Sequence, residues 1–369
     1  MVNKGPEGAV MAVAAGEEKE SFWKKLIRFF AKLFLFILET VVLLCIILYA
    51  AMYILAKGPS PSASARFVTS VRETSAIGFL ADLYFTPEEI AEIEAVKETE
   101  EFAATDTTLI TIEADKQKDE TAGPQPDAWG FIDEDGDGII VDQVKGAGYA
   151  GYMMIVLDPS RVILGSSPSD YGIRGYTVEQ YVDNFNAVAG VNAGGFLDPN
   201  GTGNGSTPDS VVVFDGEIYF AGYGCAWGIA AIDGDHILHV AKRMTPQELV
   251  ENDIRYAVCY GPVLVSNGEP ADPDSLAKSL NPRTAIGQRS DGAMLLLVID
   301  GRQVSSIGAS YQDEVDIMLR YGAVNALNLD GGSSSVMWYE GDYINKTASV
   351  IGIRPIPTSI LVMEEGYGQ

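Results

Sequence analysis

The sequence predicts a strand-rich single domain of the α+β or mixed α/β class behind an N-terminal transmembrane helix. Three observations lead to this prediction. From about Gly146 to Met363, short apolar runs alternate with turn residues, as they do in sheet proteins. Within that region, Val178–Asn186 and Gln312–Tyr321 have the apolar spacing of helices. Ahead of it, the 23 residues from Leu33 to Leu55 contain a single charge, Glu39.

The N-terminal apolar run predicts a membrane anchor over residues 33–56. As a helix, a run of this length spans about 34 Å and crosses a bilayer, whereas the alternative, a cleaved signal peptide, has a shorter apolar region. Only Lys57 follows closely, so the positive-inside rule predicts a cytoplasmic tail at residues 1–32 and an extracellular remainder. The basic residues that precede the run are Lys24, Lys25, Arg28 and Lys32.

Residues 57–126 have the composition of a helical and acidic spacer. A Pro/Ser/Ala-rich linker opens it, and Thr86 followed by Pro87 is typical of a helix N-cap and first position. The strand-rich domain is then expected at residues 127–365. Its second helix is marked by Ser310 and Asp313, which match a capping box.

The charge and the histidine count exclude several functions. The chain has 51 acidic and 25 basic residues, and its first 57 residues hold 5 and 7 of these. The remainder therefore carries 18 − 46 = −28, which argues against a nucleic-acid partner because phosphates require basic patches. His236 and His239 lie three residues apart on a predicted strand and face opposite sides, so a His-based triad or zinc site is not expected. Any catalysis must use carboxylates, hydroxyls, amides and arginine.

Three cysteines leave the redox state open. Cys45 lies in the apolar run, while Cys225 and Cys259 lie in the strand-rich region. The latter two could form one disulfide in an oxidising compartment. We favour the alternative, two unpaired buried thiols.

An acidic loop precedes the strand-rich pattern. In DEDGDGIIVD, Asp133, Asp135 and Asp137 alternate and Gly138 follows, as in the first half of an EF-hand calcium loop. Position twelve is Val144 rather than a bidentate glutamate. We therefore favour an acidic turn and keep a structural Ca²⁺ site as the alternative.

Two further stretches combine apolar strands with polar ends. In AGVNAGGFLDPNGTGNG, Asn192, Gly194 and Gly195 end a strand, where glycine permits close ligand approach. In NPRTAIGQRSDGAMLLLVIDGR, Arg283 begins one strand and can fork onto a phosphate or carboxylate, and Asp300 ends the next. An ordinary loop and a plain hairpin would give the same patterns.

The stretch NALNLDGGSSSVMW places one acid after a buried strand. Asn328 and Asp330 share a face by the period of two, and Gly331–Gly332 allow a tight turn whose amides can bind an anion or a hydroxyl. A buried carboxylate is costly without a partner, so Asp330 should pair with a cation such as Arg283 or face a polar cleft. The pattern suits the floor of a ligand site and also a structural turn.

Five collinear segments, NAGGF, GPVLVSNG, NPRTAIG, IDGR and NALNLDGGSSSVMW, resemble the phosphodiester glycosidase family over roughly residues 146–363. The chain departs from the family pattern at Ala193, inserted into Asn-Gly-Gly-Phe-Phe, at Leu197 in place of the second Phe, and at Ser333 in place of a third Gly. These departures affect loop shape and substrate choice.

The resemblance implies an α/β domain whose motifs converge on one cleft and cleave a sugar from a phosphodiester at its anomeric carbon. Asp330 and Asp300 are then the expected catalytic carboxylates, as nucleophile or general base, with Glu314 in reserve. Arg283 and Arg302 would hold the phosphate and stabilise leaving-group charge. The substrate-binding residues would be Asn192, Gly194, Gly195, Arg283, Thr284, Arg302, Asn328, Gly331, Gly332, Ser333 and Ser334.

We therefore expect a membrane-anchored, extracytoplasmic hydrolase that acts on a phosphate-linked surface or cell-wall glycan and requires no cofactor. The main alternative is a non-catalytic glycan- or wall-binding module, because a fold does not fix a function. Another phosphodiesterase class is disfavoured, since most of these use metal clusters and the chain has two histidines. The sequence does not determine the sugar, the aglycone or which aspartate has which role.

Overall fold

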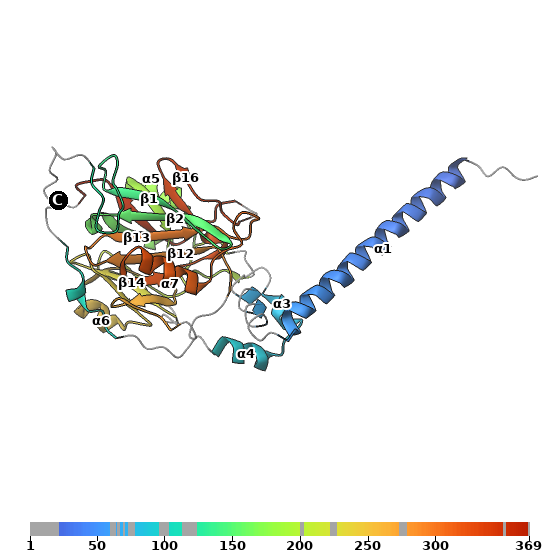
Figure 1. The fold of residues 1–369 in the computed structure, drawn as a ribbon, viewed down its shortest axis with the longest axis horizontal. Helices are drawn as coiled ribbons and strands as arrows, with labels where there is room; N and C mark the ends of the chain where they lie inside the picture. Colours follow the sequence, from blue (N-terminus) through green and yellow to red (C-terminus); the bar gives the residue numbers. More distant parts are fainter. Residues whose placement is uncertain are drawn as a thin grey trace, which may run out of the picture. The chain divides into compact units, whose positions relative to one another are not determined.

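The computed structural model describes residues 22–59, 64, 67–68, 71–72, 78–95, 103–112, 124–199, 203–221, 227–272, 279–349 and 352–367. The chain divides into two compact units, Met1–Leu55 and Ala56–Gln369. In the first, helix α1 (Phe22–Lys57) is the long blue helix of Figure 1. Among the described residues, it is the one helix long and apolar enough to cross a membrane, and its apolar window is wholly exposed.

The second unit begins with short helical elements. These are α3 (Phe79–Asp82), α4 (Pro87–Ala95) and the 3-10 turn η1 (Thr107–Leu109). Helix α4 begins as predicted: the Glu89 amide donates to Thr86 Oγ1 at 3.3 Å, and the Thr86 amide donates to Glu89 Oε2 at 2.8 Å. Thr105 accepts a hydrogen bond from the Val240 amide at 3.2 Å, so part of the predicted spacer packs on the sheets.

A seven-stranded antiparallel sheet forms the centre of the strand-rich domain, in the order β1-β2-β13-β12-β14-β10-β11. Its strands are β1 (Ile139–Gly146), β2 (Tyr149–Val156), β10 (Val263–Ser266), β11 (Glu269–Pro270), β12 (Arg283–Arg289), β13 (Met294–Ile299) and β14 (Ala323–Asn328). The first strand lies directly after the acidic loop, earlier than the pattern from Gly146 predicts, because it is an edge strand in which only Ile139 and Val144 are buried and polar residues lie between them.

Two five-stranded antiparallel sheets complete the domain. One has the order β16-β15-β4-β17-β3, with β3 (Val162–Ser166), β4 (Ala187–Asn192), β15 (Met337–Tyr339), β16 (Asp342–Tyr343) and β17 (Thr358–Met363). The other has the order β6-β5-β9-β7-β8, with β5 (Val211–Phe214), β6 (Glu217–Ala221), β7 (Ile229–Asp233), β8 (Leu238–Ala241) and β9 (Ile254–Cys259).

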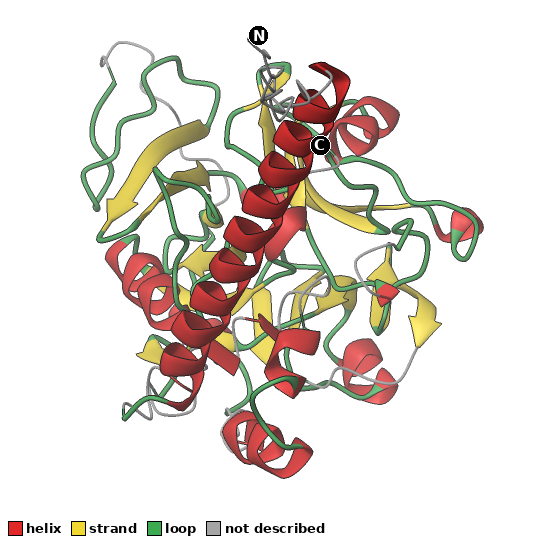
Figure 2. Ribbon diagram, turned by 90° about the vertical axis from the view of Figure 1, so that its right-hand side faces the viewer, coloured by secondary structure: helices red, strands yellow, loops and turns green. Residues whose placement is uncertain are grey.

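The three sheets share one apolar interior, and helices cover their outer faces. Leu327 of β14, Val191 of β4 and Val258 of β9 belong to the same buried cluster. Helices α5 (Val178–Phe185), α6 (Pro246–Glu251) and α7 (Tyr311–Arg320) each add buried apolar side chains to an outer cluster. Figure 2 shows strands and loops making up most of the globular unit, with short helices around them.

The predicted fold class and both predicted helices are confirmed. Ser310 and Asp313 form the predicted capping box of α7, with Ser310 Oγ accepting from the Asp313 amide at 3.2 Å. The expectation of free thiols is wrong for Cys259, which is disulfide-bonded. Cys225 lies outside the described residues.

Candidate functional site

The predicted carboxylate Asp330 lies where two sheets meet. It follows β14, and its amide donates to the Ala193 carbonyl, just after β4, at 2.9 Å. Its own carbonyl accepts from Asn192 Nδ2 at 2.5 Å. Two hydrogen bonds to one neighbouring segment therefore fix the backbone from which the Asp330 side chain extends.

Asn192 connects three segments of the site. Besides its bond to Asp330, its Oδ1 accepts from Thr284 Oγ1 at 2.8 Å and from the Val336 amide at 3.1 Å. Its side chain is fully buried. The structure thus brings together the predicted residues Asn192, Thr284 and Asp330, and the Asn192 amide group is used to join their segments.

The surroundings of the Asp330 carboxyl raise its pKa to about 7. Desolvation by the surrounding protein is the largest cause, and the negative charge of Asp209 adds to it. Hydrogen bonds from Ser334 and Tyr260 and the positive charge of Arg354 act in the opposite direction. The residue as a whole is half-buried, and its carboxyl group is the part that the surrounding protein shields from water.

The arginine close to Asp330 is Arg354, which the sequence did not indicate. Its Nη1 and Nη2 donate to the two carboxylate oxygens of Asp198 at 2.7 Å each. Nη1 also reaches Ser333 Oγ at 3.3 Å, and the guanidinium lies over the ring of Phe196 at 5.0 Å. Arg354 stands alone between short loops in the sequence, where no strand or turn pattern marks it as functional.

A second carboxyl group, Asp209, lies beside this cluster and was also missed. Its amide donates to the Gly195 carbonyl at 3.2 Å. A Cβ at Gly195 would lie 2.5 Å from Asp209 Oδ2, so the carboxyl lies against the bare backbone of this glycine. Burial raises the pKa of Asp209. The predicted Gly195 therefore has a steric role: it leaves room for an acid.

Arg283 lies on the other face of its sheet. Side chains alternate along β12, so Thr284 joins Asn192 while Arg283 and Ala285 face α7. The Arg283 guanidinium stacks 3.8 Å from the centre of the Tyr311 ring and donates to Ser279 Oγ at 2.7 Å. Its Nε lies 3.7 Å from Oε2 of the fully buried Glu314. The structure does not bring Arg283 to Asp330, and the reserve candidate Glu314 is its buried counterion.

The predicted glycine–serine turn adjoins the cluster. Gly332 has φ +63°, and its amide donates to the Pro282 carbonyl at 2.9 Å. A Cβ on Gly332 would meet the guanidinium of the exposed Arg302 at 3.3 Å. Arg302 Nη2 donates to Asn281 Oδ1 at 3.1 Å. Arg302 therefore lies beside the turn Gly331–Ser334 at Gly332, whereas Arg354 contacts the same turn at Ser333.

Three other predicted site residues form hydrogen bonds within the protein. Gly194 donates to Thr358 Oγ1 at 3.1 Å, and Asn328 Nδ2 donates to the Gly261 carbonyl at 2.6 Å. The Asp300 carboxylate accepts from the Lys346 amide at 2.9 Å and from Asn345 Nδ2 at 3.2 Å. Asp300 thus fixes the loop after β16 rather than contacting Asp330, and burial raises its pKa.

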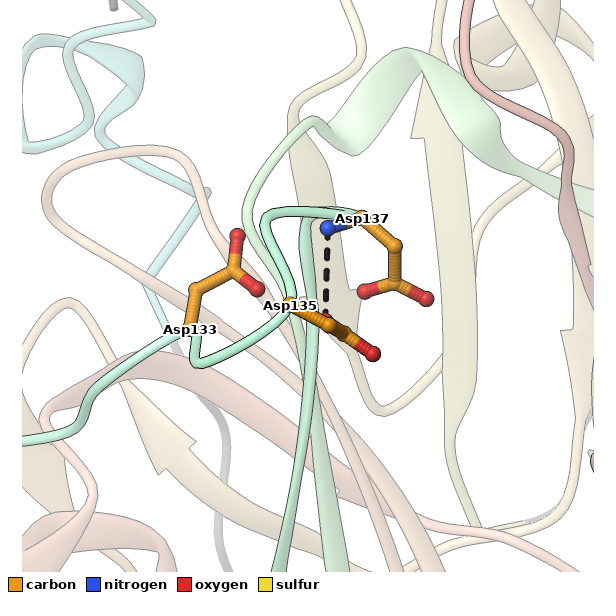
Figure 3. Close-up of side chains that lie close together, drawn as sticks. All are labelled: Asp133, Asp135 and Asp137. Atoms are coloured by element: carbon orange, nitrogen blue, oxygen red, sulfur yellow. Dashed lines mark hydrogen bonds between the residues drawn. The ribbon is translucent and has the colours of Figure 1, made fainter. Parts of the chain in front are cut away.

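The acidic loop forms a separate cluster. One carboxylate oxygen each of Asp133, Asp135 and Asp137 lies within 4.8 Å of the others, and Figure 3 shows the three side chains around the loop. The loop amides are hydrogen-bonded to these carboxylates, as where Gly138 donates to Asp133 Oδ2 at 3.0 Å. Like charges and burial raise the pKa of Asp137, burial having the larger effect. The donor set is of the all-oxygen kind that Ca²⁺ prefers.

Comparison with known proteins places part of the chain in a family. Residues 185–363 match the family model described as phosphodiester glycosidase. A stretch of 123 residues is 34% identical to the SPbeta prophage-derived uncharacterized protein YomE of Bacillus subtilis (strain 168), covering 32% of this chain and 19% of that protein. The chain therefore matches about a fifth of that relative's length.

Among solved structures, the fold is similar to a zebrafish catalytic domain. That structure is N-acetylglucosamine-1-phosphodiester alpha-N-acetylglucosaminidase auto-inhibited by its pro-peptide. The TM-score is 0.51 at 20% sequence identity, and the match covers 61% of this chain and 82% of the zebrafish chain. At this identity the match supports the fold alone.

Proposed function

We propose that this chain, which belongs to the phosphodiester glycosidase family through residues 185–363, is a membrane-anchored hydrolase that cleaves a sugar from a sugar-1-phosphodiester. The observation that carries the proposal is the position of Asp330, a desolvated carboxyl with a pKa of about 7 on a half-buried residue, beside the buried cation Arg354. A carboxyl of this pKa can exchange protons near neutral pH, and an arginine can hold a phosphate and stabilise the charge that develops on it.

The phosphate would lie at the turn Gly331–Ser334. Arg354 already donates to Ser333 Oγ, and Arg302 lies next to Gly332, so both cations are within reach of this turn. The sugar would then be placed with its anomeric carbon toward Asp330. Negative charge develops on the departing phosphate oxygen as its bond to the anomeric carbon breaks, and the two arginines would stabilise that charge.

An extracytoplasmic location is supported by two features of the chain. Helix α1 is long and apolar enough to span a membrane, and basic residues precede its apolar part. Cys259 is disulfide-bonded, and such bonds persist in oxidising compartments. The substrate would accordingly be a phosphate-linked glycan of the cell surface or wall.

The test uses the full-length chain in detergent. It would be offered N-acetylglucosamine joined through phosphate to a simple alcohol, together with a panel of other sugar-1-phosphodiesters, and free sugar would be measured by chromatography. We expect release by the parent and a loss of at least about 100-fold in Asp330→Asn. Binding of the same compounds without release would instead identify a glycan-binding module.

A further inference from the structure

The proposed hydrolysis calls for a second carboxyl group beside Asp330. Enzymes that cleave sugars at the anomeric carbon commonly use two, on opposite sides of the bond that breaks. The Asp300 carboxylate, expected from the sequence, accepts hydrogen bonds from Asn345 and Lys346. Asp209 is a better candidate, for reasons of position and charge.

Asp209 and Asp330 are held by the same short segment. The Asp330 amide donates to Ala193 and the Asp209 amide donates to Gly195, two residues further on. Two residues of extended chain span at most about 7 Å, so the two acids are anchored close together. The absence of a side chain at Gly195 is what allows the Asp209 carboxyl to lie there, since a Cβ would approach Oδ2 to 2.5 Å.

The charges around Asp209 also set it apart from the other acids. Asp198 is paired with Arg354, whereas the Asp209 carboxyl has no salt bridge to any residue that the structure describes. The groups that face the Asp330 carboxyl are Asp209, Arg354, Ser334 and Tyr260. The charge of Asp209 raises the pKa of Asp330, so the two carboxyls lie close enough for the charge of one to affect protonation of the other.

We propose that Asp209 is the second catalytic residue, the general base that takes a proton from the attacking water while Asp330 acts as the general acid. This assignment rests on the proposed function. The water oxygen forms a bond to the anomeric carbon as the bond from that carbon to the phosphate oxygen breaks. The electron pair of the broken bond stays on the phosphate oxygen, which receives the Asp330 proton, and Asp209 receives the proton lost by water. Exchange with solvent then restores both carboxyls.

The experiment compares full-length parent, Asp209→Asn, Asp330→Asn and a control, Asp235→Asn, which removes an exposed carboxylate from the β7–β8 turn. With a substrate that the parent cleaves, Asp209→Asn should lower kcat by about 100-fold or more with little change in KM. Asp235→Asn should match the parent. Azide added to Asp209→Ala should restore turnover and yield the sugar azide, a rescue that a purely structural role would not give.

The anomer of the first product provides a readout that needs no variant. Water activated by a base attacks from the side opposite the phosphate and inverts the configuration, whereas a covalent intermediate on a carboxylate retains it. Proton NMR during the first turnovers should therefore show the inverted sugar, and retention would overturn the role of Asp209 as base.

The remaining outcomes separate the two proposals. If the parent is active and the rate of Asp209→Asn lies within threefold of the parental rate, Asp209 is not the base, and the hydrolase proposal still stands. No release by the parent from the whole substrate panel rejects both. If Asp209→Asn does not fold, Asp209→Glu decides, because it keeps the charge and moves the carboxyl by one methylene; a parental rate in that variant counts against the assignment.

Discussion

Arg354 and Asp198 form a two-point ion pair next to the Asp330 carboxyl, with each guanidinium nitrogen 2.7 Å from its own carboxylate oxygen. Both side chains are largely buried, at 7% and 13% exposure. Hydrogen bonding to Asp198 is the main reason why the pKa of Arg354 is raised. The pair holds the Arg354 guanidinium beside Asp330 in a fixed orientation, from which Nη1 also reaches Ser333 Oγ at 3.3 Å.

Replacing Arg354 by lysine should test the orientation of this cation. Lysine keeps the charge and loses the fork, so we expect kcat/KM for a sugar-1-phosphodiester to fall about 100-fold. The control is Arg255→Lys, which alters an exposed pair with Asp215 and should keep the parental rate. The rates are measured by steady-state kinetics. If Arg354→Lys folds and turns over at the parental rate, the arginine has no part in turnover.

The raised pKa of Asp330 makes stability depend on pH. Its pKa is about 7 in the folded protein and about 3.9 in an unfolded chain. Between these values the folded state binds more protons, so the free energy of unfolding decreases as pH rises from about 4 to 7 and this decrease is complete above pH 7. Asp330→Asn removes the effect and should be more stable than the parent at pH 8, by on the order of 2 kcal/mol.

Denaturant unfolding of parent and Asp330→Asn at pH 8 and pH 4 checks this prediction. The stabilisation should shrink toward pH 4, where the folded parent is protonated at this position and the unfolded chain is about half protonated. Equal effects of the substitution at the two pH values would contradict a raised pKa.

The ion pair between Arg283 and Glu314 should act on stability rather than on chemistry. Arg283→Met leaves Glu314 buried without its cation, and we expect a loss of about 3–5 kcal/mol in the free energy of unfolding. The double variant Arg283→Met/Glu314→Leu should recover part of it, because no buried charge remains. Turnover per folded molecule of the double variant should stay within a few-fold of the parent, and a loss comparable with that of Asp330→Asn would place Arg283 in the reaction.

The cluster of carboxylates in the acidic loop predicts that Ca²⁺ raises the thermal stability of the protein. Bringing Asp133, Asp135 and Asp137 together costs electrostatic energy that a divalent cation offsets. Millimolar Ca²⁺ added to chelator-treated protein should raise the Tm by a few degrees, and Asp135→Asn should reduce the response. Asp235→Asn serves as the matched control. An identical Tm with Ca²⁺ and with chelator would establish that the loop is an acidic turn only.

The sequence determined the parts of this protein that depend on local pattern. Apolar runs between turns predicted the sheets, the spacing of apolar residues predicted α5 and α7, and Ser310 with Asp313 predicted a cap that the structure contains. These features follow from contacts within a few residues, so they can be read from one segment at a time. The long apolar run indicated α1 for the same reason.

Only the tertiary structure decided which charged groups meet. Arg283 adjoins the predicted motifs in sequence, but the period of two along β12 turns it toward α7 and leaves Thr284 to contact Asn192. Arg354 and Asp209 come from loops with no distinguishing pattern, and the joining of β4, β14 and β17 into facing sheets brings them to Asp330. Burial and pKa depend on neighbours distant in the chain, which is why the sequence marked Asp330 as a candidate and only the fold revealed Arg354 and Asp209 beside it.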